Sequence, residues 1–278
     1  MQLPQFYIDD LIRRAITEDI NYIDVTTDYL IDPQAQTTAY FVAKDNGVLC
    51  GLSIAMRVFE LLDPSITYQA FFQDGAHISK GDRIAQMQGS ALSLLKGERT
   101  ALNLLQHLSG IATATDLCVR QVSGTNASVA ETRKTLPGLR ALQKYAVVVG
   151  GGRNHRFNLS DAAMIKDNHI DACGGIENAV STLRARVGHM VKIEVEVRDF
   201  DELEKALKAG ADVIMLDNMS CEQMRRAVNM IDGRAKTEAS GNITLENIGE
   251  VARTGVDIIS LGALTHSVKA FDISMKIL

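Results

Sequence analysis

The sequence predicts an α/β protein of two domains, in which a smaller first domain precedes a parallel sheet covered by helices. Two observations support this class. Residues 37–95 have the short strands and turns of a small domain, whereas the second half alternates apolar, strand-like runs with helical stretches. Strand–helix alternation with mostly apolar strands is typical of parallel sheets whose two faces are buried. A length of 278 residues is also within reach of one α/β barrel with an addition.

In the first domain, residues 4–18 repeat apolar side chains at helical spacing and predict a helix. The Asp45-Asn46-Gly47 sequence is a strong turn signal and predicts a β-hairpin. Residues 91–121 predict a long helix that leads from the first domain into the second.

The second half contains six runs that predict strands, and the spacing of these runs fits a barrel-like or a doubly wound sheet. The runs are residues 127–132, 162–166, 191–197, 212–218, 235–240 and 256–262. Residues 199–211 and 244–256 are the clearest helical stretches between them, and each ends near a glycine, as helix C-caps commonly do.

Composition excludes several classes of protein. The chain is 46% hydrophobic and 23% charged, which is ordinary for a globular protein with a large core and unlike a disordered one. Its four cysteines are scattered and form no CxxC pair, so we expect reduced thiols and no zinc site. The N-terminus has acidic residues where a signal peptide would be basic, and no run is long enough to cross a bilayer. We therefore expect a soluble, cytoplasmic protein.

Charge is distributed unevenly along the chain. The formal net charge of −5 argues against a general affinity for nucleic acid or for an anionic membrane. One stretch is nevertheless strongly basic and is opposed only by Asp161. Its basic residues are Arg133, Lys134, Arg140, Lys144, Arg153, Arg156 and Lys166. On charge alone, this stretch is either a solvated face or the place where an anionic ligand is held.

Polar or small residues follow the predicted strands at their C-terminal ends, which is the edge where parallel α/β sheets bind ligands. They are Arg133, Lys134, Lys166, Glu196, Asp217, Glu238, Ser240 and Gly262. Glu194 and Glu196 are two apart and face the same side of one strand. We expect Glu194 to form an internal salt bridge and Glu196 to be the functional carboxylate. Asp217 is either a site residue or the N-cap of the next helix.

Two later turns have the character of phosphate sites. A Ser-Gly-Asn turn at Ser240, Gly241 and Asn242 precedes a predicted helix, whose backbone N–H groups would favour an anion. The turn after the last strand contains Gly262, which allows close approach, and His266, which can donate a hydrogen bond. Both turns could instead be ordinary connections. A third loop, "VVVGGGRNHR", places His155 and Arg156 beside three glycines, and arginine suits planar carboxylates.

The ordered segments of the chain resemble the quinolinate phosphoribosyltransferase family over nearly the whole length, most densely from Gly97 to Ser267. The segments are "GERTALNLLQHLSGIAT", "TRKTLPGLRALQKYAV", "GGGRNHR", "IKDNH", "IEVEV", "LDN", "EASGN" and "GALTHS". One departure is Glu131, where the family more often has aspartate; the glutamate keeps the charge and adds a methylene group.

The resemblance implies an N-terminal α/β sandwich of residues 1–108, rejoined by a tail of residues 268–278, and an incomplete barrel of six or seven strands over residues 109–267. It also implies the reaction. Quinolinate and phosphoribosyl pyrophosphate would give nicotinate mononucleotide, pyrophosphate and carbon dioxide, with magnesium, in de novo NAD synthesis. A homodimer is the minimum assembly implied, and a hexamer is the alternative.

Residue by residue, the resemblance implies the following roles. Arg133, His155, Arg156 and Lys166 would bind the quinolinate carboxylates, and Arg99 would reach the site from a neighbouring subunit. Thr132 would also bind substrate, and Lys134 and Lys166 would face the pyrophosphate. The catalytic residues would be Lys134, Lys166, Glu196 and Asp217. Glu196 and Asp217 would hold the ribose hydroxyls or magnesium, directly or through water. The 5′-phosphate would be held by Ser240, Gly241, Asn242, Gly262, Ala263, Leu264 and His266.

Two rival functions fit the same fold. One is a phosphoribosyltransferase for nicotinate or another aromatic acid, although a monocarboxylate substrate would need fewer cations. The other is a non-catalytic phosphate or nucleotide sensor, in which we would expect the strand-end carboxylates Glu196 and Asp217 to be lost.

Overall fold

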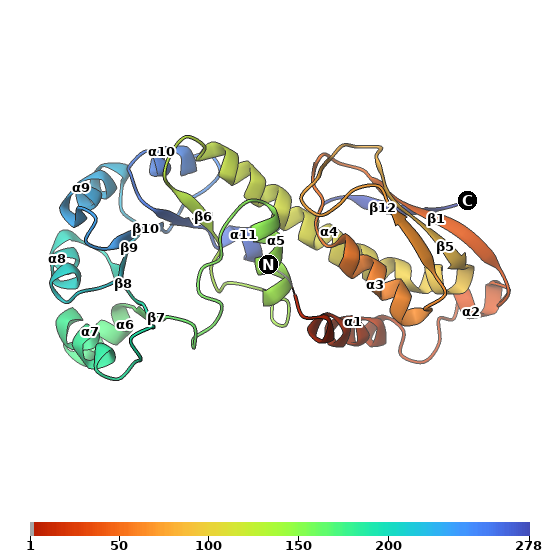
Figure 1. Cartoon of the computed structure of the whole chain (residues 1–278), viewed down its shortest axis with the longest axis horizontal. Helices are drawn as coiled ribbons and strands as arrows, with labels where there is room; N and C mark the ends of the chain where they lie inside the picture. The colour runs from red at the N-terminus through yellow and green to blue at the C-terminus, as the bar shows by residue number, and fades with distance from the viewer. Residues whose placement is uncertain (1–2) are drawn as a thin grey trace. The chain divides into compact units, whose positions relative to one another are not determined.

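The computed structural model describes residues 3–278, and the chain divides into two compact units. Unit 1 comprises the N-terminal residues through Asp116, Leu136–Gly151 and Ser267–Leu278, and unit 2 comprises Leu117–Thr135 and Gly152–His266. The C-terminal tail therefore belongs to unit 1, as does a segment, Leu136–Gly151, that lies inside the predicted barrel domain of residues 109–267. Figure 1 shows the elements of both units along the chain.

Unit 1 is built on a four-stranded antiparallel sheet with the order β12-β1-β5-β3. The strands are β1 (Gln36–Ala43), β3 (Thr67–Ala70), β5 (Arg83–Ser90) and β12 (Ile273–Ile277). β1 and β5 alternate buried and solvent-facing residues, so one face of the sheet joins the core, as antiparallel sheets commonly arrange.

Helices complete the core of unit 1. They are α1 (Gln5–Asp19), α2 (Thr27–Leu30), α3 (Leu52–Leu62), α5 (Arg140–Val149) and the larger part of α4 (Ala91–Gln121), which continues into unit 2. Phe41 of β1 meets Phe59 of α3 with ring centroids 6.1 Å apart, in the middle of the hydrophobic cluster. The predicted helices at residues 4–18 and 91–121 are confirmed, but α3 was not anticipated from the sequence.

The predicted hairpin at Asp45-Asn46-Gly47 is wrong. The turn leads from β1 to β2 (Gly47–Val48), which pairs not with β1 but with β4 (His77–Ile78). Tertiary contacts decide the pairing. The Asn46 side chain accepts a hydrogen bond from the Lys80 backbone amide. A Cβ at Gly47 would lie 2.4 Å from the Thr113 hydroxyl. Glycine is needed here for close packing against α4, and its φ is not positive.

Unit 2 is a six-stranded parallel sheet with the order β6-β11-β10-β9-β8-β7. The strands are β6 (Ser128–Ala130), β7 (Ala163–Ile165), β8 (Ile193–Val197), β9 (Val213–Asp217), β10 (Lys236–Ser240) and β11 (Ile258–Ser260). The order is that of a barrel opened between β6 and β7. Beside that opening, Arg153 makes an isolated parallel bridge to Ala130. The six predicted strands are confirmed, and the fold is the predicted incomplete barrel.

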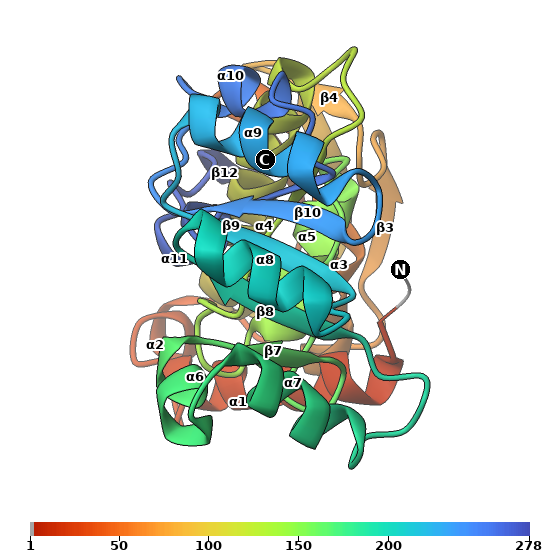
Figure 2. The ribbon, with the colours of Figure 1, turned by 90° about the vertical axis from the view of Figure 1, so that its left-hand side faces the viewer.

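Helices follow the strands of unit 2. They are α6 (Asp167–Cys173), α7 (Ile176–Arg184), α8 (Phe200–Lys208), α9 (Cys221–Ile231), α10 (Ile248–Ala252) and α11 (Ala263–His266). Of these, α8, α9 and α10 pack against one face of the sheet. Figure 2 shows α8 and α9 lying over β8–β10. The strand residues beneath, such as Val195 and Ile214, are fully buried. α10 is shorter than predicted and begins only at Ile248, so the Ser-Gly-Asn turn does not open directly into a helix. Among the described residues, no helix has the length and apolar character needed to cross a membrane.

Candidate active site

The opposite face of the unit 2 sheet carries the polar residues. Strand register places Glu196, Met215 and Glu238 side by side on adjacent strands, and Asp217 pairs with Ser240 one step further toward the C-terminal edge. Because residues two apart share a face, Glu194 lies on this same side. The parallel sheet thus separates an apolar, helix-covered face from a face that carries carboxylates.

A buried ion-paired cluster lies on this polar face. The Nε2 of His155 lies 3.3 Å from Glu194 Oε2 and 3.4 Å from Glu238 Oε1, and all three side chains are at most 12% exposed. The predicted internal salt bridge of Glu194 is confirmed. Glu238, which the sequence placed at a strand end, instead lies within β10, and its carboxylate is buried beside the imidazole.

The cluster shifts the pKa of His155. Burial by itself opposes protonation, but the hydrogen bonds and charges of Glu194 and Glu238 outweigh it and raise the pKa of His155 to about 10. Burial raises the pKa of Glu194, and the adjacent imidazole opposes that rise. The three groups lie close enough to hold a metal ion together, but the imidazole already lies within ion-pair distance of both carboxylates. We therefore interpret the group as a buried support that orients the His155 ring: Nε2 faces the two carboxylates, and Nδ1 accepts a hydrogen bond from the Arg156 backbone amide at 2.7 Å.

The raised pKa assigned to His155 predicts that the stability of the protein depends on pH. A histidine whose pKa is raised on folding stabilises the protein fully below the unfolded pKa of about 6.5, and that stabilisation disappears as pH rises to about 10. We expect the melting-temperature gap between the wild type and His155→Gln to narrow between pH 6.5 and 10. His107→Gln is the control, because burial lowers the pKa of His107 and its gap should stay level over that range. A His155→Gln gap that is constant with pH would contradict the assignment.

Two arginines lie beside the cluster. Arg156 donates to the Ala162 carbonyl at 2.9 Å, and its pKa is lowered by burial and by the charge of Arg133, with Glu194 opposing. The Nε of Arg133 is buried and has no hydrogen-bond partner among the described residues. Two guanidinium groups that repel each other, one with an unsatisfied buried donor, are the arrangement expected where an anion binds.

Lys166 and Glu196 occupy the neighbouring strand ends. Lys166 follows β7, and its Nζ forms an ion pair with Glu196 Oε2 at the end of β8. Glu196 is only 15% exposed, whereas Lys166 is 45% exposed. The structure thus pairs Lys166 with Glu196 at neighbouring strand ends, and places the His155 loop against Glu194 and Glu238 on the polar face of the same sheet.

Asp217 ends β9 and does not cap the next helix. Ser220 caps α9 in a reciprocal capping box with Gln223, which removes the alternative role for Asp217. The Asp217 carboxylate accepts a hydrogen bond from the Asn218 side chain at 2.8 Å. Ser240, Gly241 and Asn242 follow on the adjacent strand β10, so this turn and Asp217 lie side by side.

Lys134, in the segment that follows β6, is held by the turn that follows β11. Thr265 donates to the Lys134 carbonyl oxygen at 2.8 Å. A Cβ at Gly262 would lie 3.0 Å from the Lys134 side chain and 3.0 Å from the His266 ring, so glycine allows both to approach. Ala263 and Leu264 begin α11 directly after this glycine. The Thr132 hydroxyl accepts a hydrogen bond from the Lys134 backbone amide at 3.1 Å, which shapes the start of the same segment.

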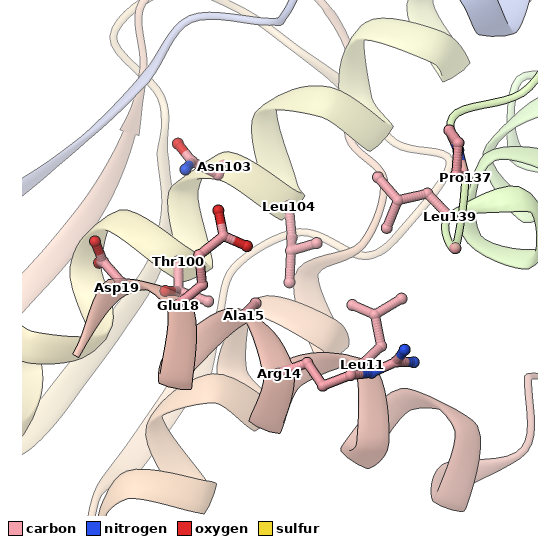
Figure 3. Close-up of a pocket in the computed structure, with 11 residues that line it drawn as sticks. Leu11, Arg14, Ala15, Glu18, Asp19, Thr100, Asn103, Leu104, Pro137 and Leu139 are labelled. Carbon is pink, nitrogen blue, oxygen red and sulfur yellow. The ribbon is translucent and has the colours of Figure 1, made fainter. Parts of the chain in front are cut away.

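Arg99 is the one predicted site residue that belongs to unit 1; the others belong to unit 2. It is exposed on α4 and lines a pocket of about 370 Å³ with Asp19, Asp24 and Lys96. A larger groove of about 510 Å³ lies further along the same helix and is lined by Thr100, Asn103 and residues of α1 (Figure 3). No predicted site residue lines that groove.

Sequence reasoning missed three residues that shape the site. Glu131 is fully buried and accepts the His155 amide at 3.1 Å, which ties the end of β6 to the His155 loop. The position of Glu131 just before Arg133 and Lys134 in the sequence was a signal that it supports the site. Thr265 and Asn218 act through hydrogen bonds to neighbouring segments, and spacing within one chain segment does not reveal such bonds.

A group of cationic side chains beside strand-end carboxylates, on an opened α/β barrel, defines a class of enzyme that handles anionic substrates at the C-terminal edge of a parallel sheet. The models of the N-terminal and the C-terminal domains of quinolinate phosphoribosyl transferase match residues 24–109 and 111–276. This chain belongs to the quinolinate phosphoribosyltransferase family.

Relatives are similar over nearly their whole length. The chain is 47% identical to a Bacillus subtilis (strain 168) protein named "Probable nicotinate-nucleotide pyrophosphorylase (carboxylating)", with 96% of this chain and 92% of that protein aligned. It is 42% identical to the Arabidopsis thaliana chloroplastic nicotinate-nucleotide pyrophosphorylase (carboxylating), over 99% of this chain and 84% of that protein. The crystal structure of NadC from Streptococcus pyogenes matches with a TM-score of 0.97 and 45% identity, covering 100% of this chain and 99% of that one.

Proposed function

We propose that this chain transfers the phosphoribosyl group of phosphoribosyl pyrophosphate to quinolinate, with decarboxylation, to give nicotinate mononucleotide in NAD synthesis. The relatives are named for this reaction. The observation that carries the proposal is the pair of repelling guanidinium groups, Arg133 and Arg156, with a buried Arg133 donor that has no partner among the described residues.

Quinolinate suits these cations better than a monocarboxylate does. Its two adjacent carboxylates supply two negative charges and planar acceptors for Arg133 and Arg156, with His155 and Lys166 as the other proposed contacts. Glu194 and Glu238 lie within 3.4 Å of His155 Nε2 and so hold the orientation of the imidazole ring.

The proposed chemistry has two bond exchanges. The pyridine nitrogen forms a bond to C1′ of the ribose while the C1′–O bond breaks, and pyrophosphate leaves with that electron pair. The bond from the ring to the 2-carboxylate then breaks and releases carbon dioxide, and the electron pair left on the ring carbon takes a proton from solvent. The cationic ring nitrogen formed in the first exchange stabilises that pair, which favours ribosyl transfer before decarboxylation.

Glu196 and Asp217 are proposed to face the ribose. As pyrophosphate leaves, C1′ develops positive charge, and fixed carboxylates nearby stabilise it electrostatically. They are also the proposed holders of magnesium, directly or through water. Both are partly exposed and end the adjacent strands β8 and β9, which suits an ion that takes one or two carboxylates together with substrate phosphates. Bound magnesium would neutralise charge on the pyrophosphate.

The remaining contacts are proposed for the phosphates. Lys134 and Lys166 would face the pyrophosphate. The turn of Ser240, Gly241 and Asn242, together with Gly262, Ala263, Leu264 and His266, would hold the 5′-phosphate. Support comes from their position at the last two strands, where α/β barrels commonly bind phosphate.

Arg99 is proposed to complete the site of a neighbouring subunit, so that a homodimer is the smallest active assembly. Its position in unit 1, exposed on α4, leaves its guanidinium accessible within the described chain. We also propose a cytoplasmic location, although the Arabidopsis relative is named chloroplastic.

Substrate preference tests the proposal against its rivals. With phosphoribosyl pyrophosphate present, we expect quinolinate to be converted to nicotinate mononucleotide and nicotinate to be turned over at least about 100-fold less efficiently, because Arg133 and Arg156 would then share one carboxylate. Product formation is followed by chromatography. Turnover of nicotinate without turnover of quinolinate would support the monocarboxylate rival, and ligand binding without any turnover would support the sensor.

A further inference from the structure

Two asparagines at successive strand ends adopt the left-handed backbone conformation. Asn218, directly after β9, has a φ of 53°, and Asn242, two residues after β10, has a φ of 51°. Asparagine tolerates this conformation better than most residues other than glycine. A positive φ is nevertheless uncommon for any residue that has a side chain. Among the described residues, the only other non-glycine position with positive φ is Asp232, at the C-terminal cap of α9.

The side chains of these asparagines form a directional ladder. Asn218 Nδ2 donates to Asp217 Oδ2 at 2.8 Å, and Asn218 Oδ1 accepts from Asn242 Nδ2 at 2.9 Å. The Asn242 carbonyl accepts from Asn247 Nδ2 at 3.1 Å, at the start of α10. The Asn218 side chain therefore uses both its donor and its acceptor, and only an amide side chain supplies both at this position.

The backbone is shaped around this ladder. The Asn218 amide donates to the Ser240 carbonyl at 2.9 Å, which carries the β9–β10 pairing beyond the strand ends. A Cβ at Gly241 would lie 2.3 Å from Asn218 Oδ1, and Gly241 itself has a φ of +91°. Both the available space and the backbone conformation thus require glycine at position 241. The side-chain amide of Asn218 occupies the space that a side chain there would need.

We propose that Asn218 is a positioning residue that couples the Asp217 carboxylate to the turn of Gly241 and Asn242. This inference rests on the proposed function, in which Asp217 faces the ribose and the turn holds the 5′-phosphate. With Oδ2 held by Asn218, the carboxylate keeps Oδ1 for the ribose or magnesium. Because Asn218 Oδ1 accepts a hydrogen bond from Asn242, the turn of Gly241 and Asn242 is fixed in position relative to the Asp217 carboxylate. The distance between the two ends of the phosphoribosyl group is therefore built into the protein.

Asn218→Gly tests the ladder without straining the backbone, because glycine accepts the positive φ and removes the side chain that carries the amide. We expect the KM for phosphoribosyl pyrophosphate to rise at least about tenfold, whereas the dissociation constant of quinolinate, measured by calorimetry, stays within about twofold of the wild type. Asp232→Gly is the matched control: it makes the same kind of change at a left-handed position in a helix cap, and we expect wild-type kinetics.

A double-mutant cycle separates a ladder from two independent contacts. Because the two amide side chains are hydrogen-bonded to each other, Asn218→Gly should raise the KM much less in an Asn242→Gly background than in the wild type. Additive effects, or a wild-type KM for phosphoribosyl pyrophosphate in Asn218→Gly, would overturn the inference. Absence of quinolinate turnover in the wild type would instead refute the proposed function. The ladder would then be tested by calorimetry with ribose 5-phosphate, whose binding Asn218→Gly should weaken at least about tenfold and Asp232→Gly should not.

Discussion

Replacing Glu196 by glutamine should lower kcat by about 100-fold or more while leaving the fold intact. The change keeps the size of the side chain and removes one negative charge from the end of β8, where the carboxylate is paired with Lys166. The charge is proposed to act on the positive C1′ of the transition state and on magnesium, not on quinolinate, so we expect kcat to fall further than quinolinate affinity. Steady-state kinetics and calorimetry measure the two effects separately.

Glu202→Gln is the matched control for this prediction. Glu202 is also 15% exposed and is also paired with a basic side chain, Arg198, but it lies on α8, which covers the opposite face of the sheet. The two variants lose the same charge from similarly exposed ion pairs. Wild-type kcat in Glu196→Gln would remove this carboxylate from the mechanism, whereas equal losses in both variants would indicate a general effect of charge.

Mixing two inactive variants should restore activity if the site is shared between subunits. Arg99→Ala and Lys134→Ala remove residues that belong to different units of the chain. In a mixed dimer, one site would combine the intact Arg99 of one subunit with the intact Lys134 of the other. After random exchange of equal amounts, about half of the dimers are mixed, and each mixed dimer has one intact site out of two. We therefore expect about a quarter of wild-type activity.

The control mixture pairs Arg133→Ala with Lys134→Ala. Both residues lie in the segment that follows β6, so no arrangement of the two subunits assembles a complete site. We expect no recovery there. Failure of the Arg99→Ala and Lys134→Ala mixture to recover activity, after subunit exchange has been verified by tagged subunits, would contradict the shared site.

The arrangement of unit 2 could be predicted from sequence because parallel strands impose it. Once six apolar runs alternate with helices, their carboxyl ends must meet at one edge, and Lys166, Glu196 and Asp217 are placed there by topology alone. The pairing of Glu194 was predictable for a similar reason, since a buried carboxylate requires a partner.

What sequence did not predict depends on contacts between distant segments. The Asp45-Asn46-Gly47 turn has the local chemistry of a hairpin, but Thr113 and the strand β4 determine its partner. Glu238 was assigned to a strand end, and only the fold shows that it lies inside the sheet beside His155. The amide ladder from Asp217 to Asn247 joins two loops, and neither loop shows this in its own sequence.

The balance of products tests the central claim most directly. Quinolinate labelled in its 2-carboxylate is incubated with the protein, phosphoribosyl pyrophosphate and magnesium, and labelled carbon dioxide, pyrophosphate and nicotinate mononucleotide are measured together. The proposed function predicts equal amounts of all three, and no carbon dioxide when phosphoribosyl pyrophosphate is omitted. Carbon dioxide released without phosphoribosyl pyrophosphate, or pyrophosphate formed without carbon dioxide, would contradict it.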